Sequence, residues 1–421
     1  MANRQQLWHR ALPALLAFAF IGVFTLQPAP EEAERVARLP WTCLFTCGDQ
    51  ALRDAVLNVI LFVPLGLALR PLLPGRLALL LVALTTVSIE FTQYHWLLGR
   101  DPSLRDILTN TAGGGIGIWL AGSWRELLQP SPDRSSRFSL ATLLGWLAMV
   151  GITGALVGPS MTPSLYWVQW APELGQFDTW GGEVLGARMN GVPLPSGRSN
   201  RTNQLRAQLL SDSVMVEASI VSGEPPGKLA PIVSMFDSYQ REIFVLGQHR
   251  RTLAFGIRTG LRAIGLGDIY VRLDAFPGGE PGDTALVSGG VVHGEWVLRA
   301  AHGPEVAETR IPMSPGLMWG ALLPFFFVLG PATPYFSAAW LAGTIAPAGY
   351  FAARCREPGR RLAIAAGVAA LGLTLAGLVP GLGLPPVTEY LGTLAGLAAG
   401  WGIARWVGQC IPVRGAEAGP S

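Results

Sequence analysis

Polar and ionisable residues recur at helical spacing inside apolar stretches in the first third of the chain. They form three pairs: Asp54 with Asn58, Glu90 with Gln93, and Asp106 with Asn110. Residues three or four positions apart lie on one face of a helix, so each pair presents two polar groups to the same neighbour. An ionisable side chain within an apolar span is costly and indicates a functional site. We therefore expect these pairs to form one site for a polar ligand.

The chemistry that these side chains offer is proton transfer together with recognition of a headgroup. We predict that Glu90 and Asp106 are catalytic, because a partly desolvated carboxyl can act as a general acid or base. The predicted substrate-binding residues are Asp54, Asn58, Gln93, Arg100 and Asn110. Among them, Arg100 offers a forked donor for a phosphate oxygen. Neither histidine nor cysteine joins the cluster, so we predict no metal there and no cofactor. The alternative is that these residues only join helices by hydrogen bonds, with Arg100 neutralising Asp106.

The composition indicates what holds these residues in place. The chain has 421 residues and a net charge of +3, with 50% hydrophobic residues and only 14% charged ones. Its mean hydropathy is +0.37, and soluble domains usually carry about 25% charged residues. These values exclude a disordered chain, an ordinary cytosolic enzyme and a protein that binds nucleic acid through basic patches. They predict a polytopic α-helical membrane protein with a soluble insert.

Apolar stretches of suitable length predict eight or nine membrane spans. They are Ala11–Leu26, Ala55–Leu69, Leu77–Leu97, Ile107–Ala121, Phe138–Val157, Pro315–Gly330, Tyr335–Ala353, Leu362–Val379 and Tyr390–Val407. The first is either an uncleaved anchor or a signal peptide, and Pro315–Gly330 is either a span or a re-entrant segment. The predicted domains are a five-span bundle at 1–158, an inserted β-domain at 159–311, a C-terminal membrane bundle at 312–409 and a tail at 410–421.

The insert reads as an all-β domain. No apolar stretch between residues 159 and 311 is long enough to cross a bilayer. Segments with alternating or β-prone patterns lie between glycine-containing turns, which is typical of a β-sandwich. They are Ser213–Val221, Arg241–Gln248, Thr252–Thr259 and Ile269–Phe276.

The distribution of arginine predicts the orientation, because cytoplasmic loops are enriched in basic residues. Arg4 and Arg10 precede the first span, and Arg70 and Arg76 follow the second. These two segments are therefore predicted to be cytoplasmic. The β-domain is then extracytoplasmic, and the three polar pairs all lie in the outer leaflet. A transporter needs polar groups near the midplane, so this placement favours a headgroup site over transport. The arginines between 354 and 361 favour eight spans.

The two helical regions share a worn internal repeat. Pro64-Leu65-Gly66 recurs as Pro347-Ala348-Gly349, and the block that begins at Asp106 recurs from Glu389. The positions that match Glu90 and Gln93 hold Thr374 and Gly377. Either the C-terminal bundle is a degenerate copy that lost its polar residues, or the likeness is a chance similarity of helices rich in glycine and alanine.

Residues from Cys43 to about Gly122 resemble the VanZ-like family. The resemblance rests on Cys43…Cys47-Gly48, Asn58-x3-Phe62-x-Pro64-x-Gly66, Glu90-x2-Gln93, Gly99-Arg100 and Arg105-Asp106-x3-Asn110-x2-Gly113. It implies a bacterial cytoplasmic-membrane protein of the cell envelope that binds or acts on lipid-linked headgroups, of a cell-wall precursor or a phospholipid. It also implies a link to teicoplanin-type resistance. Many members have two adjacent acidic residues where this chain has Ser88-Ile89-Glu90, which weakens a two-acid mechanism.

Residues Val214–Thr259 resemble a concanavalin A-like, laminin-G-type jelly roll. The resemblance implies carbohydrate binding, with cell-wall or exopolysaccharide glycan as a partner. Candidate Ca²⁺ ligands are Asp237, Asp268, Asp274 and Asp283, which are alternatively turn-forming residues. Trp167, Trp170 and Trp180 could stack on sugars or pack in the core. A non-catalytic, membrane-anchored glycan sensor is therefore the alternative function.

Cys43 and Cys47 are a disulfide candidate in the first outer loop. The extracytoplasmic side permits oxidation, although a helical pair four residues apart would need some distortion to close.

Overall fold

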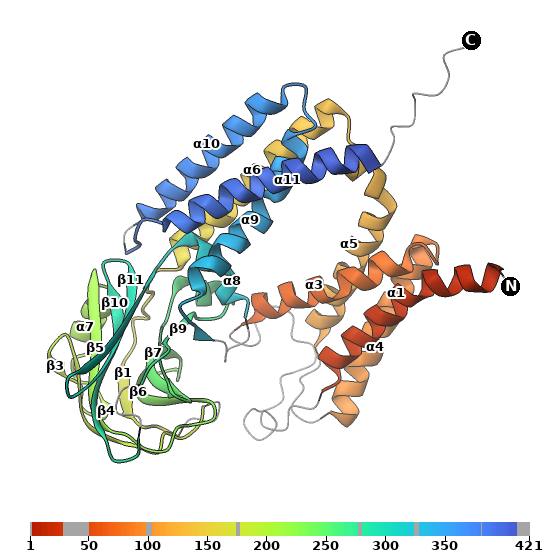
Figure 1. The fold of residues 1–421 in the computed structure, drawn as a ribbon. Helices are drawn as coiled ribbons and strands as arrows, with labels where there is room; N and C mark the ends of the chain where they lie inside the picture. The colour runs from red at the N-terminus through yellow and green to blue at the C-terminus, as the bar shows by residue number, and fades with distance from the viewer. Residues whose placement is uncertain are drawn as a thin grey trace, which may run out of the picture. The chain divides into compact units, whose positions relative to one another are not determined.

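The computed structural model describes residues 2–27, 50–97, 103–173, 177–276, 280–323, 328–379 and 381–410 (Figure 1). The chain divides into two compact units, Met1–Gln129 and Pro130–Ser421. The first unit is helical, and the second combines helices with a β-sandwich. The boundary differs from the predicted five-span bundle at 1–158, because the fifth helix packs within the second unit.

The first unit contains α1 (Ala2–Thr25), α3 (Ala51–Leu69), α4 (Gly75–Trp96) and α5 (Leu104–Leu128). Local signals set the ends of two of them. Pro74 precedes α4, and Ser103 caps α5 by accepting a hydrogen bond from the Asp106 N–H at 3.1 Å. Contacts between α3 and α5 dominate this unit, with α4 against α5 and α1 against α3.

The buried and exposed faces of α4 fit a membrane span. Its outward face carries an apolar stripe, whose exposed members are Leu77, Leu80, Leu84, Val87 and Phe91. Glu90 and Gln93 lie on the buried face. In water such a stripe would be unfavourable, whereas in lipid it is the expected surface.

Four of the described helices are long and apolar enough to cross a membrane by length and composition, namely α3, α4, α6 and α10. The second unit contributes α6 (Pro132–Leu156), α9 (Thr333–Ala352), α10 (Pro358–Gly377) and α11 (Val387–Cys410). Eight described helices thus reach 19 or more residues. The segment Pro315–Gly330 instead begins with a 3₁₀ turn, η2 (Pro315–Leu317), and a single helical turn, α8 (Met318–Ala321). Its described part therefore holds no helix of spanning length.

Two antiparallel sheets form the sandwich, consistent with a jelly roll fused to the membrane helices. The seven-stranded sheet has the order β13-β9-β8-β7-β6-β1-β4, and the six-stranded sheet has the order β12-β11-β10-β5-β2-β3. The only described parallel pair is β13 with β9. Strand bounds are β1 Tyr166–Trp170, β2 Glu183–Met189, β3 Val192–Pro193, β4 Gly197–Arg198, β5 Ser213–Val221, β6 Leu229–Asp237, β7 Glu242–His249, β8 Thr252–Ile257, β9 Tyr270–Leu273, β10 Thr284–Val292, β11 Glu295–His302, β12 Glu305–Pro312 and β13 Val328–Leu329. Two shorter elements complete it, α7 (Thr202–Leu209) and η1 (Gly260–Ile264).

The predicted strand segments coincide with β5, β7, β8 and β9. Alternation is clear in β5, where Val214, Val216, Ala218 and Ile220 point into the core between the sheets. Residues of β6 are buried throughout. Ala230, Ile232, Val233 and Met235 belong to the main core, and Leu229 joins a second small cluster with Phe177 and Tyr270. Two-residue turns with positive φ at both positions close the β2–β3 and β10–β11 hairpins, Asn190-Gly191 and His293-Gly294.

The internal repeat reappears as a packing pattern. In the first unit, a Cβ at Gly113 or Gly117 would collide with the carbonyl oxygen of Val59 or Val63 on α3. In the second unit, Gly396 and Gly400 meet the carbonyl oxygens of Ala342 and Ala346 on α9 in the same way. Both members of each contact lie 283 positions later than in the first unit. The α3–α5 and α9–α11 pairs therefore interlock in one register, which favours a degenerate copy over chance similarity.

Candidate functional site

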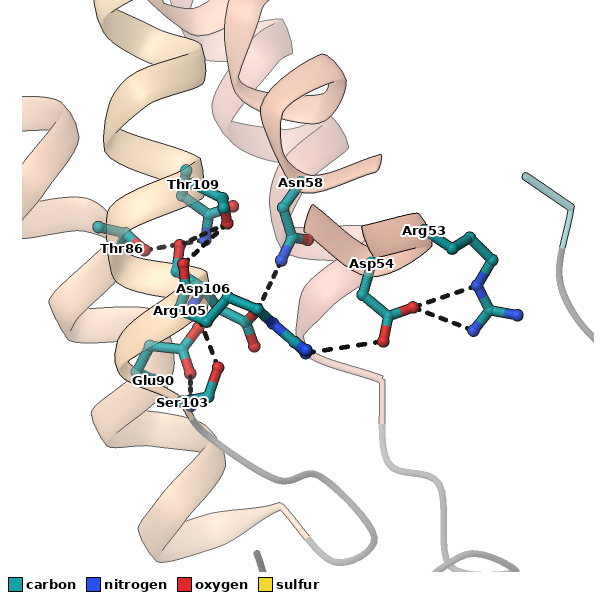
Figure 2. Close-up of polar contacts among 10 residues, drawn as sticks. Arg53, Asp54, Asn58, Thr86, Glu90, Ser103, Arg105, Asp106 and Thr109 are labelled. Atoms are coloured by element: carbon teal, nitrogen blue, oxygen red, sulfur yellow. Dashed lines mark hydrogen bonds and ion pairs between the residues drawn. The ribbon is translucent and has the colours of Figure 1, made fainter. Parts of the chain in front are cut away.

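The polar site in the first unit depends on how closely α5 approaches α3 and α4. Gly113 and Gly117 let the α5 backbone contact α3, and Gly66 lets α3 contact Gly114 in return. Gly114 also faces Val82 of α4 at a separation that excludes a Cβ. Small residues at helix interfaces allow such close backbone approach within membranes. The start of α5 is thereby held between the polar ends of its two neighbours (Figure 2).

A chain of alternating charges joins α3 to α5. Asn58 donates from Nδ2 to Asp106 Oδ1 at 2.8 Å. The Arg105 Nε lies 3.4 Å from Asp106 Oδ1, and its Nη2 lies 3.6 Å from Asp54 Oδ2. The other Asp54 oxygen accepts from Arg53 at 3.0 Å. Arg105 thus bridges two carboxylates from different helices, as Figure 2 shows.

The α4 side chains meet α5 through two further hydrogen bonds. Glu90 Oε2 accepts from the backbone N–H of Ser103 at 3.0 Å. One helical turn deeper, Asn110 donates to Thr86 Oγ1 at 2.9 Å. The Oδ1 atom of Asn110 is buried and has no hydrogen-bond partner among the described residues. Because a buried unpaired acceptor is unfavourable, this amide is a candidate to receive a donor from a ligand.

Burial distinguishes the roles of the acidic groups. Glu90 is buried, whereas Asp54 and Asp106 are half-buried. Glu90 is therefore the most desolvated carboxyl of the cluster, and Asp54 lies at its open margin. Within lipid, such charges are retained only with partners and where they serve a purpose.

Residues 2–125 match the family model described as VanZ/LLP1. This part of the chain carries a VanZ-like domain. The match includes α1 and so begins well before Cys43, where the motif resemblance starts. No curated protein and no solved structure matches the chain.

The structure brings together five of the predicted site residues in the VanZ-like domain. They are Asp54, Asn58, Glu90, Asp106 and Asn110. Gln93 instead donates from Nε2 to the backbone oxygen of Thr25 at 2.9 Å, so it joins α4 to α1. Arg100 and the disulfide candidate Cys43–Cys47 lie outside the described residues.

Sequence reasoning missed four residues of this cluster: Arg53, Thr86, Ser103 and Arg105. Arg105 had a usable signal in the sequence, because it directly precedes Asp106 at the start of an apolar helix. In the structure it is only 9% exposed. Ser103 also had one, since serine three residues before an aspartate is a common helix start. Thr86 and Arg53 offered no such pattern.

The arrangement suits binding of a polar group with proton transfer by Glu90. The described cluster supplies two guanidinium and three carboxyl groups, so acceptors outnumber cations. A ligand that brings hydroxyl or ammonium donors therefore meets suitable partners here. The Asn58–Asp106–Arg105 contacts fix Asp106, while Glu90 has only the Ser103 N–H as a described hydrogen-bond donor. Glu90 is accordingly the better proton carrier of the two predicted catalytic residues.

The β-sandwich contains a second buried polar cluster near η1. Tyr270 donates its hydroxyl to Glu242, and Arg262 pairs with Asp268 at 2.5 Å. Burial raises the pKa of Glu242 to about 7, and the charge of Asp268 adds to this effect. Burial likewise raises the pKa of Asp268, against the opposing effect of Arg262. These contacts hold the end of the sheet that adjoins α6, where Pro159 pairs with Thr259.

Three of the four candidate Ca²⁺ ligands, Asp237, Asp268 and Asp274, have other partners. The carboxylate of Asp237 accepts hydrogen bonds from the Tyr239 and Arg241 N–H groups, from Thr162 and from the Arg241 guanidinium. These donors hold its pKa below the usual value, although burial opposes them. Asp268 and Asp274 pair with arginines. Among the described residues, no group of three or more His, Cys, Asp or Glu side chains could hold a metal ion.

Two of the three tryptophans considered for sugar stacking are engaged within the sandwich. Trp180 is buried and donates to Gln248 Oε1, and Trp170 donates to the Leu194 carbonyl oxygen. Trp167 is half-buried and lies across from Arg198 in the sheet.

Proposed function

We propose that the VanZ-like domain binds a lipid-linked headgroup at the outer leaflet of a bacterial cytoplasmic membrane and that Glu90 exchanges a proton with it. The observation that carries this proposal is the buried cluster at the start of α5, in which Arg105 bridges Asp54 and Asp106 beside Glu90. A cluster that only joined helices would need fewer charges, because neutral hydrogen bonds join helices at a lower desolvation cost. The positive-inside distribution of arginine supports the outer leaflet.

The proposed headgroup carries both hydroxyl groups and a phosphate, as a phospholipid or a lipid-linked cell-wall precursor does. Its hydroxyl groups would donate to Glu90 and to the unpaired Asn110 Oδ1. Its phosphate would meet Arg100, which lies three positions before Ser103 in the sequence. The family resemblance and the match at residues 2–125 support an envelope role of this kind.

Native mass spectrometry of the purified full-length protein tests the proposal. Wild type is compared with Glu90→Gln and Arg100→Ala, and with Thr374→Ala as a matched control at the equivalent position of the second helical region. We expect wild type and the control to retain a polyprenyl- or phospho-lipid that the Arg100 variant loses. Accumulation of that lipid in Glu90→Gln would indicate turnover. Equal and unselective lipid in every variant would refute the headgroup site.

An anchor for a glycan sensor is the second candidate. The observation that favours it is a set of hydrogen bonds that join the sandwich to the helices of the second unit. Ser314 and the Gly316 N–H donate to Glu389 of α11, and Ser160 donates to the Arg258 carbonyl oxygen at 3.0 Å. In that case, a strain that expresses Glu90→Gln would have the same teicoplanin susceptibility as one that expresses wild type. Replacement of the residues that bind glycan would instead abolish the effect of the protein on teicoplanin susceptibility.

A further inference from the structure

A polar hollow of about 590 Å³ lies on the sandwich between the segment that leads into β1 and the start of α7. Eleven residues line it, and none of them is acidic. Three are arginines, Arg198, Arg201 and Arg206, and most of the others carry hydroxyl or amide groups. The hollow is separate from the VanZ-like domain, so what it binds is independent of the function proposed above.

The three guanidinium groups are unopposed. Among the described residues, none of these side chains makes a hydrogen bond or an ion pair. The Nε atom of Arg206 is buried and has no hydrogen-bond partner there. A desolvated cationic donor without an acceptor is unfavourable, and an arriving anion would remove that cost.

The first turn of α7 adds backbone donors to the same hollow. Thr202, Asn203 and Gln204 all line it. The first N–H groups of a helix lack partners within the helix, and no side chain caps α7. Helix N-termini favour anions through these donors and the helix dipole.

We propose that this hollow binds a phosphate ester. Three guanidinium groups and free backbone donors exceed what one carboxylate can accept, whereas a phosphate offers three or four oxygens. The surrounding Ser, Thr, Asn and Gln side chains suit the hydroxyl groups of a glycerol or sugar attached to it. The ester comes either from a membrane lipid headgroup or from a soluble phosphorylated compound, and both present the same group.

The full-length protein in neutral detergent is titrated with two probes, glycerol 3-phosphate by calorimetry and phosphatidylglycerol by native mass spectrometry. Arg201→Ala and Arg201→Ala/Arg206→Ala are compared with wild type. Arg299→Ala, an exposed arginine of β11, is the matched control. Loss of charge-assisted hydrogen bonds should weaken binding roughly tenfold or more in the double variant. Arg201 is exposed, so its replacement should leave folding intact.

Binding of both probes, lost in the double variant and kept in Arg299→Ala, would establish a phosphate site open to soluble esters. Binding of phosphatidylglycerol alone, with the same variant pattern, would assign the site to a lipid headgroup. Failure of wild type to bind either probe, or equal binding by all variants, would overturn the proposal. Binding at this hollow depends on Arg201 and Arg206, whereas lipid retention by the VanZ-like domain is tested through Arg100→Ala, so failure of one proposal is distinguishable from failure of the other.

Discussion

Replacing Gly113 by alanine tests whether close contact between α3 and α5 assembles the cluster of the VanZ-like domain. A Cβ at this position would fall within the contact distance of the Val59 carbonyl oxygen, carbon and Cα. These are backbone atoms that cannot rotate away, so the two helices must separate. Gly115 is the matched control on the same helix, because its Cβ would sit 3.6 Å from the flexible Leu79 Cδ1.

The comparison of the two variants isolates the packing effect. Alanine favours a helix over glycine by about 1 kcal/mol, and this gain is common to both substitutions. Overpacking costs about 1–3 kcal/mol and applies only to Gly113→Ala. We therefore expect Gly115→Ala to be as stable as wild type or more so, and Gly113→Ala to be about 1–3 kcal/mol less stable than Gly115→Ala.

Thermal inactivation in neutral detergent, followed by size-exclusion chromatography, measures this difference. One kcal/mol corresponds to a shift of roughly 2–8 °C for a unit of this size. Lipid retention should also fall in Gly113→Ala, since a wider α3–α5 spacing lengthens the Asn58–Asp106 bond. Equal midpoints for the two variants would show that α5 does not contact α3 at Val59 and would remove the basis for the cluster.

Three further predictions concern the charges and the repeat. Arg105→Met leaves Asp54 and Asp106 without their bridge and should lower the free energy of unfolding by about 3 kcal/mol. Adding Asp106→Asn to this variant should restore part of the loss. No recovery would mean that Arg105 and Asp106 are not coupled. Because burial raises the pKa of Glu242 from 4.5 to about 7, this group stabilises the fold at low pH and loses that contribution as pH rises through 7. The melting temperature should therefore fall less steeply between pH 5 and 8 in Glu242→Gln than in wild type. An unchanged dependence of melting temperature on pH would contradict the raised pKa of Glu242. In the second unit, Gly396→Ala should lower the melting temperature while Gly402→Ala, with open space around its Cβ, should not.

The amino-acid pattern was sufficient for most elements and for the faces of the helices. Apolar runs located the long helices, and alternation located β5, because each reports burial along a single element. It did not reveal that α6 packs against α9 and α10, because the apolar pattern of a helix shows which face is buried but not which helix covers that face. Pro315–Gly330 was ambiguous for a related reason: apolar residues in a short turn against the sandwich read like those of a span.

The same limit applies to the candidate site. The spacing of Glu90 and Gln93 correctly indicated one buried face of α4, yet Gln93 turned out to contact α1. The contact of Asn58 with Asp106 spans 48 positions and depends on the glycines of α5, whose effect on helix distance was foreseeable only in general. Arg105 stands directly before Asp106 in the quoted motif, but it was not predicted to be a site residue, because a charged residue beside an aspartate at a helix start fits an ordinary surface pair equally well.

Because the register of 283 positions is constant, the C-terminal helices offer the same backbone packing without most of the polar residues, and the polar cluster can be introduced there by substitution. Ser337, Leu341 and Thr393 occupy the places of Asp54, Asn58 and Asn110, on a backbone that interlocks in the same way. Glu389 already stands where Asp106 does, held by Ser314. Asparagine at position 341 would give this carboxylate the amide neighbour that Asp106 has. One chain thus holds both a polar cluster and a nearly apolar version of it, and transplanting residues between them would measure what the charges cost and what they enable.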